Sequence, residues 1–269
     1  MNRTVVITGA GGVLCSAFAK EMARTGAPVA LLDRSLEAAQ RVEEEIAQAG
    51  GQAKAYAADV LDKQSLEAAH EAVVRDLGKC RVLINGAGGN HPKATTAQEI
   101  FADNTAFPTF FDLETEGFDL VFRLNLMGTL LPTQVFAADM LGEGGCILNV
   151  SSMNAYRPLT KIPAYSAAKA AVSNFTQWLA VHFAGQGIRV NAIAPGFFVT
   201  NQNRSLLFDE AGNPTARTEK ILRATPMKRF GEPEELLGTL RWLTDEEASG
   251  FVTGVVVPVD GGFSAYSGV

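Results

Sequence analysis

Short apolar stretches alternate with longer segments of helical periodicity along most of the chain. Most of the short stretches are apolar throughout, which is typical of strands buried on both faces of a parallel sheet. The longer segments carry apolar residues at helical spacing, which predicts helices. The predicted strands are Thr4–Thr8, Val29–Asp33, Ala53–Ala57, Val82–Asn85, Cys146–Val150, Arg189–Ile193 and Val255–Pro258. The predicted helices are Ser16–Thr25, Leu36–Ala49, Ser65–Leu77, Phe118–Met140, Ala164–Ala184 and Pro233–Thr244.

This order, a strand and then a helix repeated about six times, indicates an α/β fold. We expect a single-domain, Rossmann-like, doubly wound parallel sheet of about seven strands flanked by helices. Right-handed crossovers then place the ligand crevice at the carboxyl ends of the strands. No repeat, linker or low-complexity tract divides the sequence, so residues 1–269 are predicted to form one domain.

Two segments, residues 90–115 and 197–225, read as irregular and contain prolines. Both follow predicted strand ends on the side where a ligand should bind. Long loops inside a compact domain are usually functional lids or insertions. We therefore expect these two loops to hold the substrate.

Composition narrows the class of protein. The chain has 269 residues, 47% of them hydrophobic, and a formal net charge of −6. These values fit a globular domain with a sizeable core and argue against a broad nucleic-acid or membrane surface. The sequence shows no signal peptide and no apolar run of the roughly 20 residues that a membrane span needs. Three cysteines without a metal-ligand pattern complete the expectation of a reduced, cytoplasmic, metal-free protein.

A glycine-rich segment closes the first predicted strand and opens the first helix. Gly9, Gly11 and Gly12 allow the backbone to approach a pyrophosphate, and free amide N–H groups together with the dipole of the following helix favour the anion. Val13 and Leu14, directly after the glycines, are expected to contact the cofactor as well. A plain tight turn needs the same glycines, so the segment is weak evidence by itself.

An acidic residue strengthens the interpretation as a dinucleotide site. Asp33 ends the second predicted strand roughly 20 residues beyond the glycines, where a carboxylate can accept hydrogen bonds from the adenosine ribose. The carboxylate also repels a 2′-phosphate, whereas the neighbouring Arg34 could stack on adenine or attract that phosphate. The pair favours NAD as the cofactor and leaves NADP possible. Without the glycine loop it would be an ordinary solvated strand end.

Tyr165 and Lys169 are the candidate acid–base pair. They lie four residues apart in an alanine-rich stretch that favours a helix, so both side chains share one helical face. A phenol has an unperturbed pKa near 10, but a nearby ammonium favours the phenolate and lowers that pKa. On its own, a tyrosine and a lysine at this spacing are more often ordinary surface residues.

The chain resembles the short-chain dehydrogenase/reductase family along essentially its whole length. The resemblance is carried by six ordered signals: Tyr165-x-x-x-Lys169, Ser151-Ser152, Asn85-Gly86-Ala87-Gly88, Asp59-Val60, Asn125 and Asn191-Ala192-Ile193-Ala194-Pro195-Gly196. It implies an NAD(P)-dependent oxidoreductase that acts on a hydroxyl or carbonyl carbon. The cofactor carries the hydride and the protein manages the proton.

The resemblance also implies a role for each matching residue. Tyr165 would exchange the proton at the substrate oxygen, and Lys169 would lower its pKa and bind the nicotinamide ribose. Ser152 would hold and polarise the substrate oxygen, while Asn125 would hold a water near Lys169. The remaining expected cofactor contacts are Asp59 and Val60 at the adenine, Asn85, Gly86 and Ala87 at the ribose, and Pro195, Gly196, Phe198 and Thr200 at the nicotinamide.

The glycine loop departs from the family pattern. Val13 and Cys15 stand where the last two glycines of Thr-Gly-x-x-x-Gly-x-Gly belong. We expect a changed backbone path near the pyrophosphate, with Cys15 crowding the contact between helix and strand. Gly86 also stands where the family commonly has a second asparagine, a departure to which we attach little weight.

The residues expected around the substrate are polar and locally basic on an acidic protein, which favours a hydroxylated anion such as a sugar acid. They are Asn90, Lys93, Ser152, Asn154, Arg157, Lys161 and Arg204. Residues 88–96, 152–155, 159–163 and 260–269 resemble the sugar-acid branch of D-mannonate oxidoreductases (fructuronate reductases). That branch implies the reversible reduction of D-fructuronate to D-mannonate. Each of the polar residues could equally be an ordinary solvated loop residue.

Three alternatives stay open at this point. The chain could reduce another sugar acid or polyol, as gluconate 5-dehydrogenases do, or a 3-ketoacyl thioester. It could also be a dinucleotide-sensing regulatory protein, since this fold supports such roles. The family resemblance implies a homotetramer, for which the helix 164–184 and the tail 263–269 look suited, although both could simply pack within one subunit.

Overall fold

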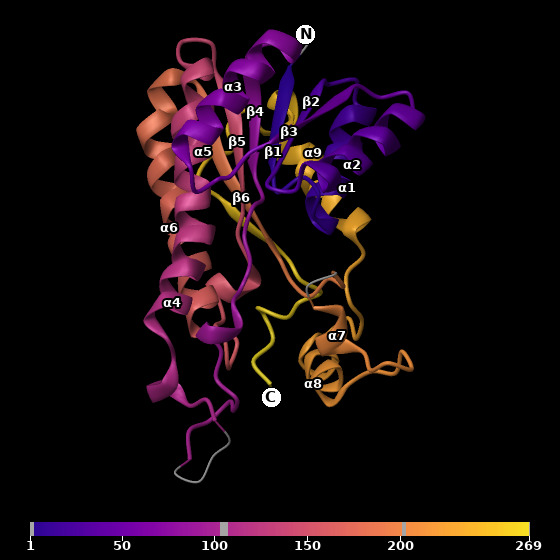
Figure 1. The fold of residues 1–269 in the computed structure, drawn as a ribbon, viewed down its shortest axis with the longest axis vertical. Helices are drawn as coiled ribbons and strands as arrows, with labels where there is room; N and C mark the ends of the chain where they lie inside the picture. Colours follow the sequence, from indigo (N-terminus) through magenta and orange to yellow (C-terminus); the bar gives the residue numbers. More distant parts are fainter. Residues whose placement is uncertain (1–2, 103–106, 201–202, 269) are drawn as a thin grey trace.

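The computed structural model describes residues 3–102, 107–200 and 203–268, in which seven strands form one parallel sheet of order β3-β2-β1-β4-β5-β6-β7 (Figure 1). The strands are β1 (Thr4–Thr8), β2 (Val29–Asp33), β3 (Ala53–Ala57), β4 (Cys80–Asn85), β5 (Gly145–Val150), β6 (Ile188–Pro195) and β7 (Val256–Val259). The α-helices are α1 (Val13–Arg24), α2 (Leu36–Gln48), α3 (Lys63–Leu77), α4 (Thr115–Phe122), α5 (Gly128–Phe136), α6 (Pro163–Phe183), α7 (Arg204–Leu207), α8 (Ala216–Ala224), α9 (Leu237–Thr244) and α10 (Glu246–Ser249). The order confirms the predicted doubly wound α/β fold.

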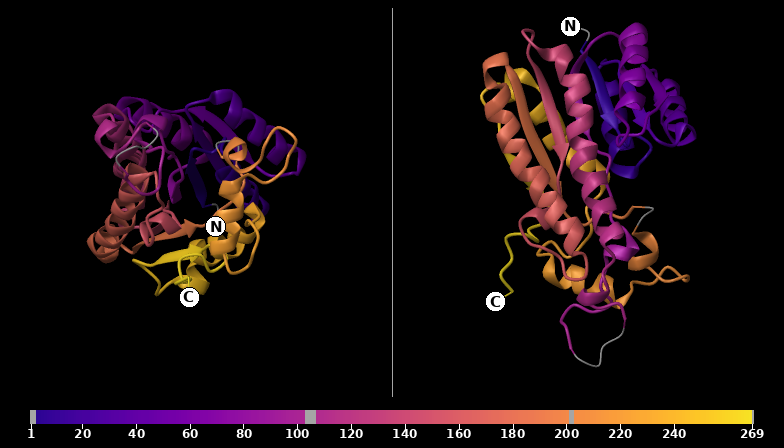
Figure 2. Two further views of the ribbon diagram at one scale, coloured as in Figure 1. Left: turned by 90° about the horizontal axis from the view of Figure 1, so that it is seen from below. Right: turned by 60° about the vertical axis from the view of Figure 1, so that its left-hand side comes forward.

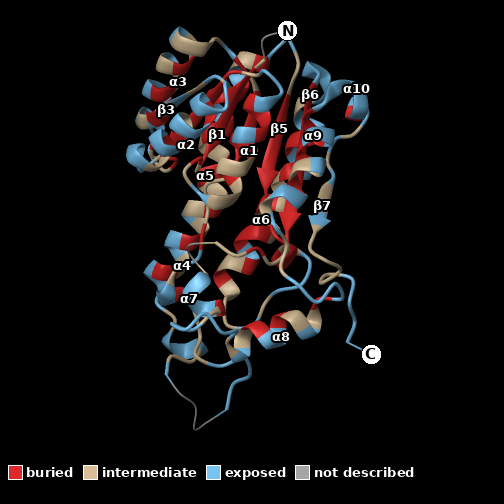
Figure 3. Ribbon diagram, turned by 90° about the vertical axis from the view of Figure 1, so that its right-hand side faces the viewer, coloured by how far each residue is buried: buried red, intermediate tan, exposed pale blue. Residues whose placement is uncertain are grey.

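Two hydrophobic cores lie on the two faces of the sheet. Successive side chains of a strand point to opposite faces, so Val5 and Ile7 of β1 belong to the core under α1, α2 and α9. Val6 belongs to the other core, under α3, α5 and α6. All five residues of β1 are buried, which explains why this strand shows no alternation of polar and apolar residues. Figure 3 shows the buried sheet between the layers of helices.

The predicted helix 118–140 is not a single regular helix. It divides into α4, a π-helical turn at Arg123–Met127, α5, and a 3₁₀ turn at Ala137–Met140. Pro132 lies inside α5 and has no N–H for the regular helical hydrogen bond, which makes this segment tolerant of irregular turns. π-turns within α-helices are frequent at functional sites, and Asn125 lies in this one.

The expectation of an irregular 197–225 segment is wrong, because it contains α7 and α8. The pair Asn213-Pro214, which suggested a loop, precedes the start of α8, where the Thr215 hydroxyl accepts a hydrogen bond from the Thr218 amide and caps the helix. The other segment, 90–115, forms two 3₁₀ turns at Pro92–Ala94 and Phe110–Asp112 in its described part. Figure 2 shows both segments below the carboxyl end of the sheet.

One stretch of the described residues, Thr115–Met140, is long and apolar enough to cross a membrane by length and composition alone. It is not an unbroken apolar run, because charged residues such as Glu116, Asp119 and Arg123 lie within it. Core helices pass the same test, and this stretch packs against α3 and α6 beside the sheet. We interpret it as a core helix.

Candidate active site

The candidate site lies where the central strands end. β1, β4, β5 and β6 are neighbours in the sheet, so their last residues, Thr8, Asn85, Val150 and Pro195, lie along one edge. The segments that follow these strands carry most of the residues predicted for cofactor and catalysis. The sheet thereby gathers segments that are far apart in sequence at the edge expected for a ligand.

The glycine loop forms a cradle that a dinucleotide fits. Gly9 adopts a left-handed φ of +67°, and a side chain there would come within 3.0 Å of the Ala87 backbone. Gly12 precedes α1 without any side-chain cap, so the first amides of the helix beyond it, from Val13 and Leu14, are not satisfied by a capping side chain. Uncapped helix amides attract anions. The loop therefore has the close backbone packing and the free donors that a pyrophosphate needs.

Asp33 closes the adenosine side of this cradle. Its carboxylate accepts hydrogen bonds from the Gly11 amide at 3.0 Å and the Ser35 amide at 2.9 Å. A side chain at position 11 would meet both the Asp33 carboxylate and Ala38. Arg34 is exposed beside it. The acidic side chain is thus held in place at the end of β2, where the sequence predicts contact with a ribose.

The expected adenine contacts, Asp59 and Val60, lie after β3. The Asp59 amide donates to the Ser65 hydroxyl at 3.0 Å, and its carboxylate accepts from the Leu61 amide at 2.9 Å. Val60 is buried, and its side chain lies against Gly128 at the start of α5. These contacts fix a firm turn beside the cradle. Their predicted contact with adenine stays a prediction.

The side chain of Asn85 does not face an open site. It is buried and donates to the Thr133 hydroxyl at 3.0 Å and to the Asn149 side chain at 2.9 Å. Its own side-chain oxygen is buried without a partner among the described residues. Asn85 therefore joins β4 to β5 and α5, and only its backbone could border a ribose, together with Gly86 and Ala87, whose amides lie near the Thr8 hydroxyl.

Gly86 and Cys15 form a matched pair, so the departure at Gly86, to which we attached little weight, matters for packing. A Cβ atom on residue 86 would overlap the Cys15 sulfur. Cys15 is buried on α1 and belongs to the core under that helix. The bulk added at position 15 therefore occupies the space left free at position 86. The expected crowding at Cys15 is relieved by the second departure from the family pattern.

Tyr165 and Lys169 lie one turn apart near the start of α6, as predicted. The Lys169 ammonium is 5.8 Å from the centre of the Tyr165 ring and donates a hydrogen bond to the Val150 carbonyl at 2.7 Å. Ser152 follows β5, and its hydroxyl accepts from the Asn154 amide at 3.2 Å. The Ser152 hydroxyl also lies close enough to the Tyr165 phenol to lower its pKa. The three predicted catalytic side chains therefore converge.

The electrostatics of this group differ from the expectation. Burial raises the pKa of Tyr165, and the hydrogen bond with Ser152 opposes that rise only in part. Burial also lowers the pKa of Lys169 to about 8. The groups of the chain alone thus keep the phenol protonated at neutral pH. A protonated phenol suits the donor role needed for reducing a ketone.

Asn125 lies within the π-turn, buried beside Lys169. Its side-chain amide donates to the carbonyls of Gly89 and Val121, both at 2.8 Å. A side chain at position 88 would meet both the Asn125 oxygen and the Lys169 ammonium. Gly88 therefore permits the asparagine and the lysine to approach each other. The predicted water between them stays a prediction.

The residues predicted to contact the nicotinamide lie at the end of β6 and just after it. Pro195 ends the strand, and Gly196 packs so closely on Asp260 that a Cβ would lie 2.5 Å from the Asp260 Cα. Thr200 donates its amide to the Asn203 side chain at 2.8 Å. The Phe198 ring is 4% exposed and packs in the core, and it also lines the pocket described below, so its predicted contact with the nicotinamide stays a prediction.

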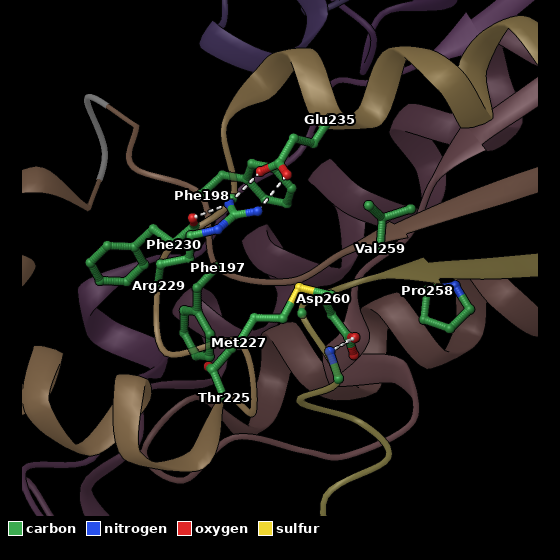
Figure 4. Close-up of a pocket in the computed structure, with 13 residues that line it drawn as sticks. Phe197, Phe198, Thr225, Met227, Arg229, Phe230, Glu235, Pro258, Val259 and Asp260 are labelled. Carbon is green, nitrogen blue, oxygen red and sulfur yellow. Dashed lines mark hydrogen bonds and ion pairs between the residues drawn. The ribbon is translucent and has the colours of Figure 1, made fainter.

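A pocket of about 360 Å³ lies at the ends of β6 and β7, and Ser152, Tyr165 and Lys169 are not among the residues that line it (Figure 4). Its walls come from the ends of β6 and β7 and from the connection between α8 and α9, with Met227 and Asp260 near its centre. Arg229 and Glu235 form an ion pair on its rim. Chemistry, rather than the size of this pocket, therefore identifies the catalytic position at Ser152, Tyr165 and Lys169.

The residues predicted to bind substrate are only partly available. Lys93 pairs with Glu114 at 2.6 Å, Arg157 donates to the Ser264 carbonyl at 2.9 Å, and Arg204 lies over the Phe208 ring. Asn90 donates to the Thr95 hydroxyl at 3.1 Å. These four side chains therefore already have partners within the protein, and their contacts join the loops to one another.

Asn154 and Lys161 differ from that group. Asn154 is buried two residues after Ser152, and its side-chain oxygen has no partner within the described part of the chain. Lys161 has a φ of +73°, a conformation that is uncommon for a residue with a side chain. In the ranges 3–102, 107–200 and 203–268 no acidic group lies within ion-pair distance of its ammonium. These two side chains have hydrogen-bonding capacity left for a ligand.

Comparison with known proteins agrees with this geometry. Residues 9–264 match the family model described as enoyl-(acyl carrier protein) reductase. The chain belongs to the short-chain dehydrogenase/reductase family. It is 62% identical to an uncharacterized oxidoreductase of Haemophilus influenzae over 100% of this chain and 95% of that one. It is 32% identical to the 7α-hydroxysteroid dehydrogenase of Escherichia coli K12 over 97% and 94% of the two chains.

A solved structure from Haemophilus influenzae, provisionally named a D-mannonate oxidoreductase and containing bound NAD, has 60% identity to this chain. It covers 100% of this chain and 97% of its own, with a TM-score of 0.96. The fold and the oxidoreductase class of this short-chain dehydrogenase/reductase are therefore established. In the described ranges, no group of three or more histidine, cysteine or acidic side chains could hold a metal ion.

Sequence reasoning missed two features of the site. It did not find the Val150 carbonyl as the partner of Lys169, because a backbone acceptor leaves no signal in the sequence. It also did not find the turn after β7, whose Asp260 carboxylate accepts from the Gly262 and Ser264 amides. The run Asp260-Gly261-Gly262 was a usable signal, since an aspartate before glycines is typical of a capped turn.

Proposed function

We propose that the protein is an NAD-dependent reductase of a sugar-acid ketone, most specifically of D-fructuronate to D-mannonate. The observation that carries the reaction class is the convergence of Ser152, Tyr165 and Lys169 at the strand ends beside the glycine cradle. Bound nicotinamide supplies the hydride. Ser152 holds the substrate oxygen, and the protonated Tyr165 phenol donates a proton to it.

NAD is supported over NADP by the position of Asp33. Its carboxylate is fixed by Gly11 and Ser35 at the end of β2, where it would repel a 2′-phosphate. The similar structure with bound NAD supports the same choice. Arg34 could attract the 2′-phosphate of NADP, so the assay below compares NADH with NADPH.

The sugar-acid class is supported by two of the predicted substrate residues, whose side chains keep polar atoms without a partner among the described residues. Asn154 can accept a hydrogen bond from a substrate hydroxyl, and Lys161 offers an ammonium for a carboxylate. Backbone strain of the kind seen at Lys161 clusters at binding sites. The provisional name of the 60% identical structure also supports D-mannonate.

A substrate panel tests the proposal. The purified protein is assayed with NADH and with NADPH against D-fructuronate, 5-ketogluconate and a 3-ketoacyl thioester. We expect NADH oxidation only with the sugar acids and the highest kcat/KM for D-fructuronate. Fast turnover of the thioester without turnover of D-fructuronate would refute the substrate. Dinucleotide binding without any turnover would favour the regulatory alternative.

The assembly and location follow as part of the same proposal. The α5 and α6 surface carries exposed Trp178, Val181 and Leu141, with the Trp178 and His182 rings stacked 4.6 Å apart. An apolar surface of this kind favours subunit contact. We infer a cytoplasmic homotetramer that uses this surface, and light scattering of the purified protein would test the subunit number.

A further inference from the structure

The segment that follows the catalytic serine is fastened to the C-terminal end of the chain. The Tyr156 hydroxyl donates to the Val256 carbonyl of β7 at 2.6 Å. The next residue, Arg157, donates its Nε–H to the Ser264 carbonyl at 2.9 Å. Two consecutive side chains therefore reach about a hundred residues along the chain to hold backbone acceptors.

The C-terminal turn, residues 260–264, is itself a closed unit. Both oxygens of the Asp260 carboxylate are used, one by the Gly262 amide at 2.9 Å and the other by the Ser264 amide at 2.8 Å. Gly261 and Gly262 have φ values of +63° and +87°, which a turn of this shape requires. The position of the Ser264 carbonyl is therefore fixed relative to β7.

This C-terminal turn contacts the two other walls of the site. The Phe263 ring packs edge-to-face on Phe197, which follows the nicotinamide-side Gly196, with ring centres 5.2 Å apart. The Gly261 carbonyl accepts a hydrogen bond from the Met227 amide at 3.2 Å, just beyond the end of α8. Figure 4 shows Asp260, Met227 and Phe197 around one pocket. Movement of the turn would therefore move the substrate-loop wall as well.

We propose that Arg157 is a positioning residue. Its hydrogen bond to the Ser264 carbonyl joins the C-terminal turn to the segment that carries Ser152. Through the contacts with Phe197 and Met227, the C-terminal turn then sets the position of the 197–225 substrate loop relative to Ser152. The proposal rests on the proposed oxidoreductase function and gives Arg157 a role other than direct contact with the substrate carboxylate. Among the described residues, the glycine-loop end of the cofactor cradle, formed by β1, α1 and the end of β2, shares no hydrogen bond with this turn.

Kinetics of Arg157→Ala and Arg157→Lys test the proposal, with Arg41→Ala on the exposed face of α2 as the matched control. We expect both Arg157 variants to raise the KM for D-fructuronate about tenfold, with kcat and the Kd for NADH changed less than about threefold. Arg157→Lys should not restore the normal KM, because an ammonium group cannot take the position of the guanidinium Nε–H. A variant with lysine that retains the normal KM would overturn the proposal.

Asp260→Ala in the full-length chain supplies the second arm. Loss of the carboxylate that accepts from the Gly262 and Ser264 amides should release the turn and raise the KM by a similar factor, and Arg157→Ala in the same chain should add nothing further. If the effects of the two changes on KM multiply, the changes act independently, which would contradict the proposal. A neutral keto sugar should show the same penalty, whereas loss of the penalty with that substrate would assign Arg157 to the carboxylate.

Hydrogen exchange provides a readout that does not depend on turnover. In Arg157→Ala, peptides covering the C-terminal turn and the end of α8 should exchange faster, while peptides of the glycine loop should not change. Unchanged exchange in the turn would overturn the proposal even if the enzyme acts on another substrate. Failure of D-fructuronate turnover in the unmodified protein would instead refute the proposed function alone.

Discussion

The two halves of the site are built in different ways. On the cofactor side, the glycine loop and the segment after β4 pack backbone against backbone, with Cys15 filling the space beside Gly86. On the substrate side, exposed side chains join separate loops, as in the pairs of Lys93 with Glu114 and Lys220 with Glu99. Changes in the first half should therefore disturb cofactor binding and folding, and changes in the second should alter substrate affinity with little loss of stability.

The largest expected effect lies at the boundary of the two halves. Tyr165→Phe removes the proton donor, and turnover should fall by about 10²–10⁴-fold because general acid catalysis is lost. The Kd for NADH, measured by fluorescence titration, should stay within about twofold since the ring is retained. Substantial residual activity would show that the proton travels by another route.

The matched pair at Cys15 and Gly86 sharpens the account of the cofactor half. Gly86→Asn alone should destabilise the fold by about 2–3 kcal/mol and weaken NADH binding, because its Cβ meets the Cys15 sulfur. Cys15→Gly in the same chain should restore much of both quantities. Thermal unfolding and NADH titration of the two single variants and the double variant complete the cycle, and additive effects would mean that the two positions are independent.

Acid sensitivity of the fold should be greatest at a buried carboxylate of α1, the helix after the glycine loop, because the exposed Glu235, whose pKa is also lowered to about 2, is screened by solvent. Hydrogen bonds from Arg24, with smaller help from Arg241, lower the pKa of the 6% exposed Glu21 from its ordinary value of 4.5 to about 2. Because the pKa of Glu21 is lower in the folded than in the unfolded protein, its ionised carboxylate stabilises the fold at pH values above the unfolded-state pKa. That contribution is lost as the pH falls from about 4.5 towards 2. Glu21→Gln should therefore cost about 1–3 kcal/mol at pH 7 and flatten the pH dependence between those values.

Urea unfolding at pH 7 and at pH 3 measures this difference. The fold of Glu21→Gln should lose less stability between the two pH values than the unmodified protein does. Equal losses in both proteins would assign the acid sensitivity to other carboxylates.

The smallest effect is expected at the exposed ion pair between the substrate loops. Lys220 and Glu99 are 2.9 Å apart, and their side chains are 65% and 40% exposed. Glu99→Gln should change the free energy of unfolding by less than about 0.5 kcal/mol, since exposed ion pairs contribute little. A loss as large as that of Glu21→Gln, measured under the same conditions, would remove the contrast between the two halves.

The sequence was most informative where one physical rule determines the structure. Thr4–Thr8 and Val29–Asp33 are buried on both faces, so their continuous apolar character predicts strands with the observed bounds. The i, i+4 spacing of Tyr165 and Lys169 likewise predicts a shared helical face. The sequence was less informative where tertiary contacts determine the bounds of a helix or the direction of a side chain. The start of α8 depends on a cap at Thr215, and the side chain of Asn85 is drawn inward by Thr133 and Asn149.

The substrate residues show the same limit. Lys93, Arg157 and Arg204 were expected near the substrate because they are cations in loops at the strand ends. Their partners come from remote segments or from a neighbouring ring, which neither periodicity nor motif spacing reveals. The direction of the pKa change at Tyr165 was also missed, because it depends on burial that the spacing to Lys169 does not encode.

Isotope transfer tests the central claim most directly. The protein is supplied with D-fructuronate and NADH deuterated at the reactive face of C4, and the sugar-acid product is analysed by mass spectrometry. The account predicts one deuterium on the new carbinol carbon for each NADH oxidised, since hydride moves directly between cofactor and substrate. A product without deuterium, or oxidation of NADH without formation of the reduced acid, would contradict it.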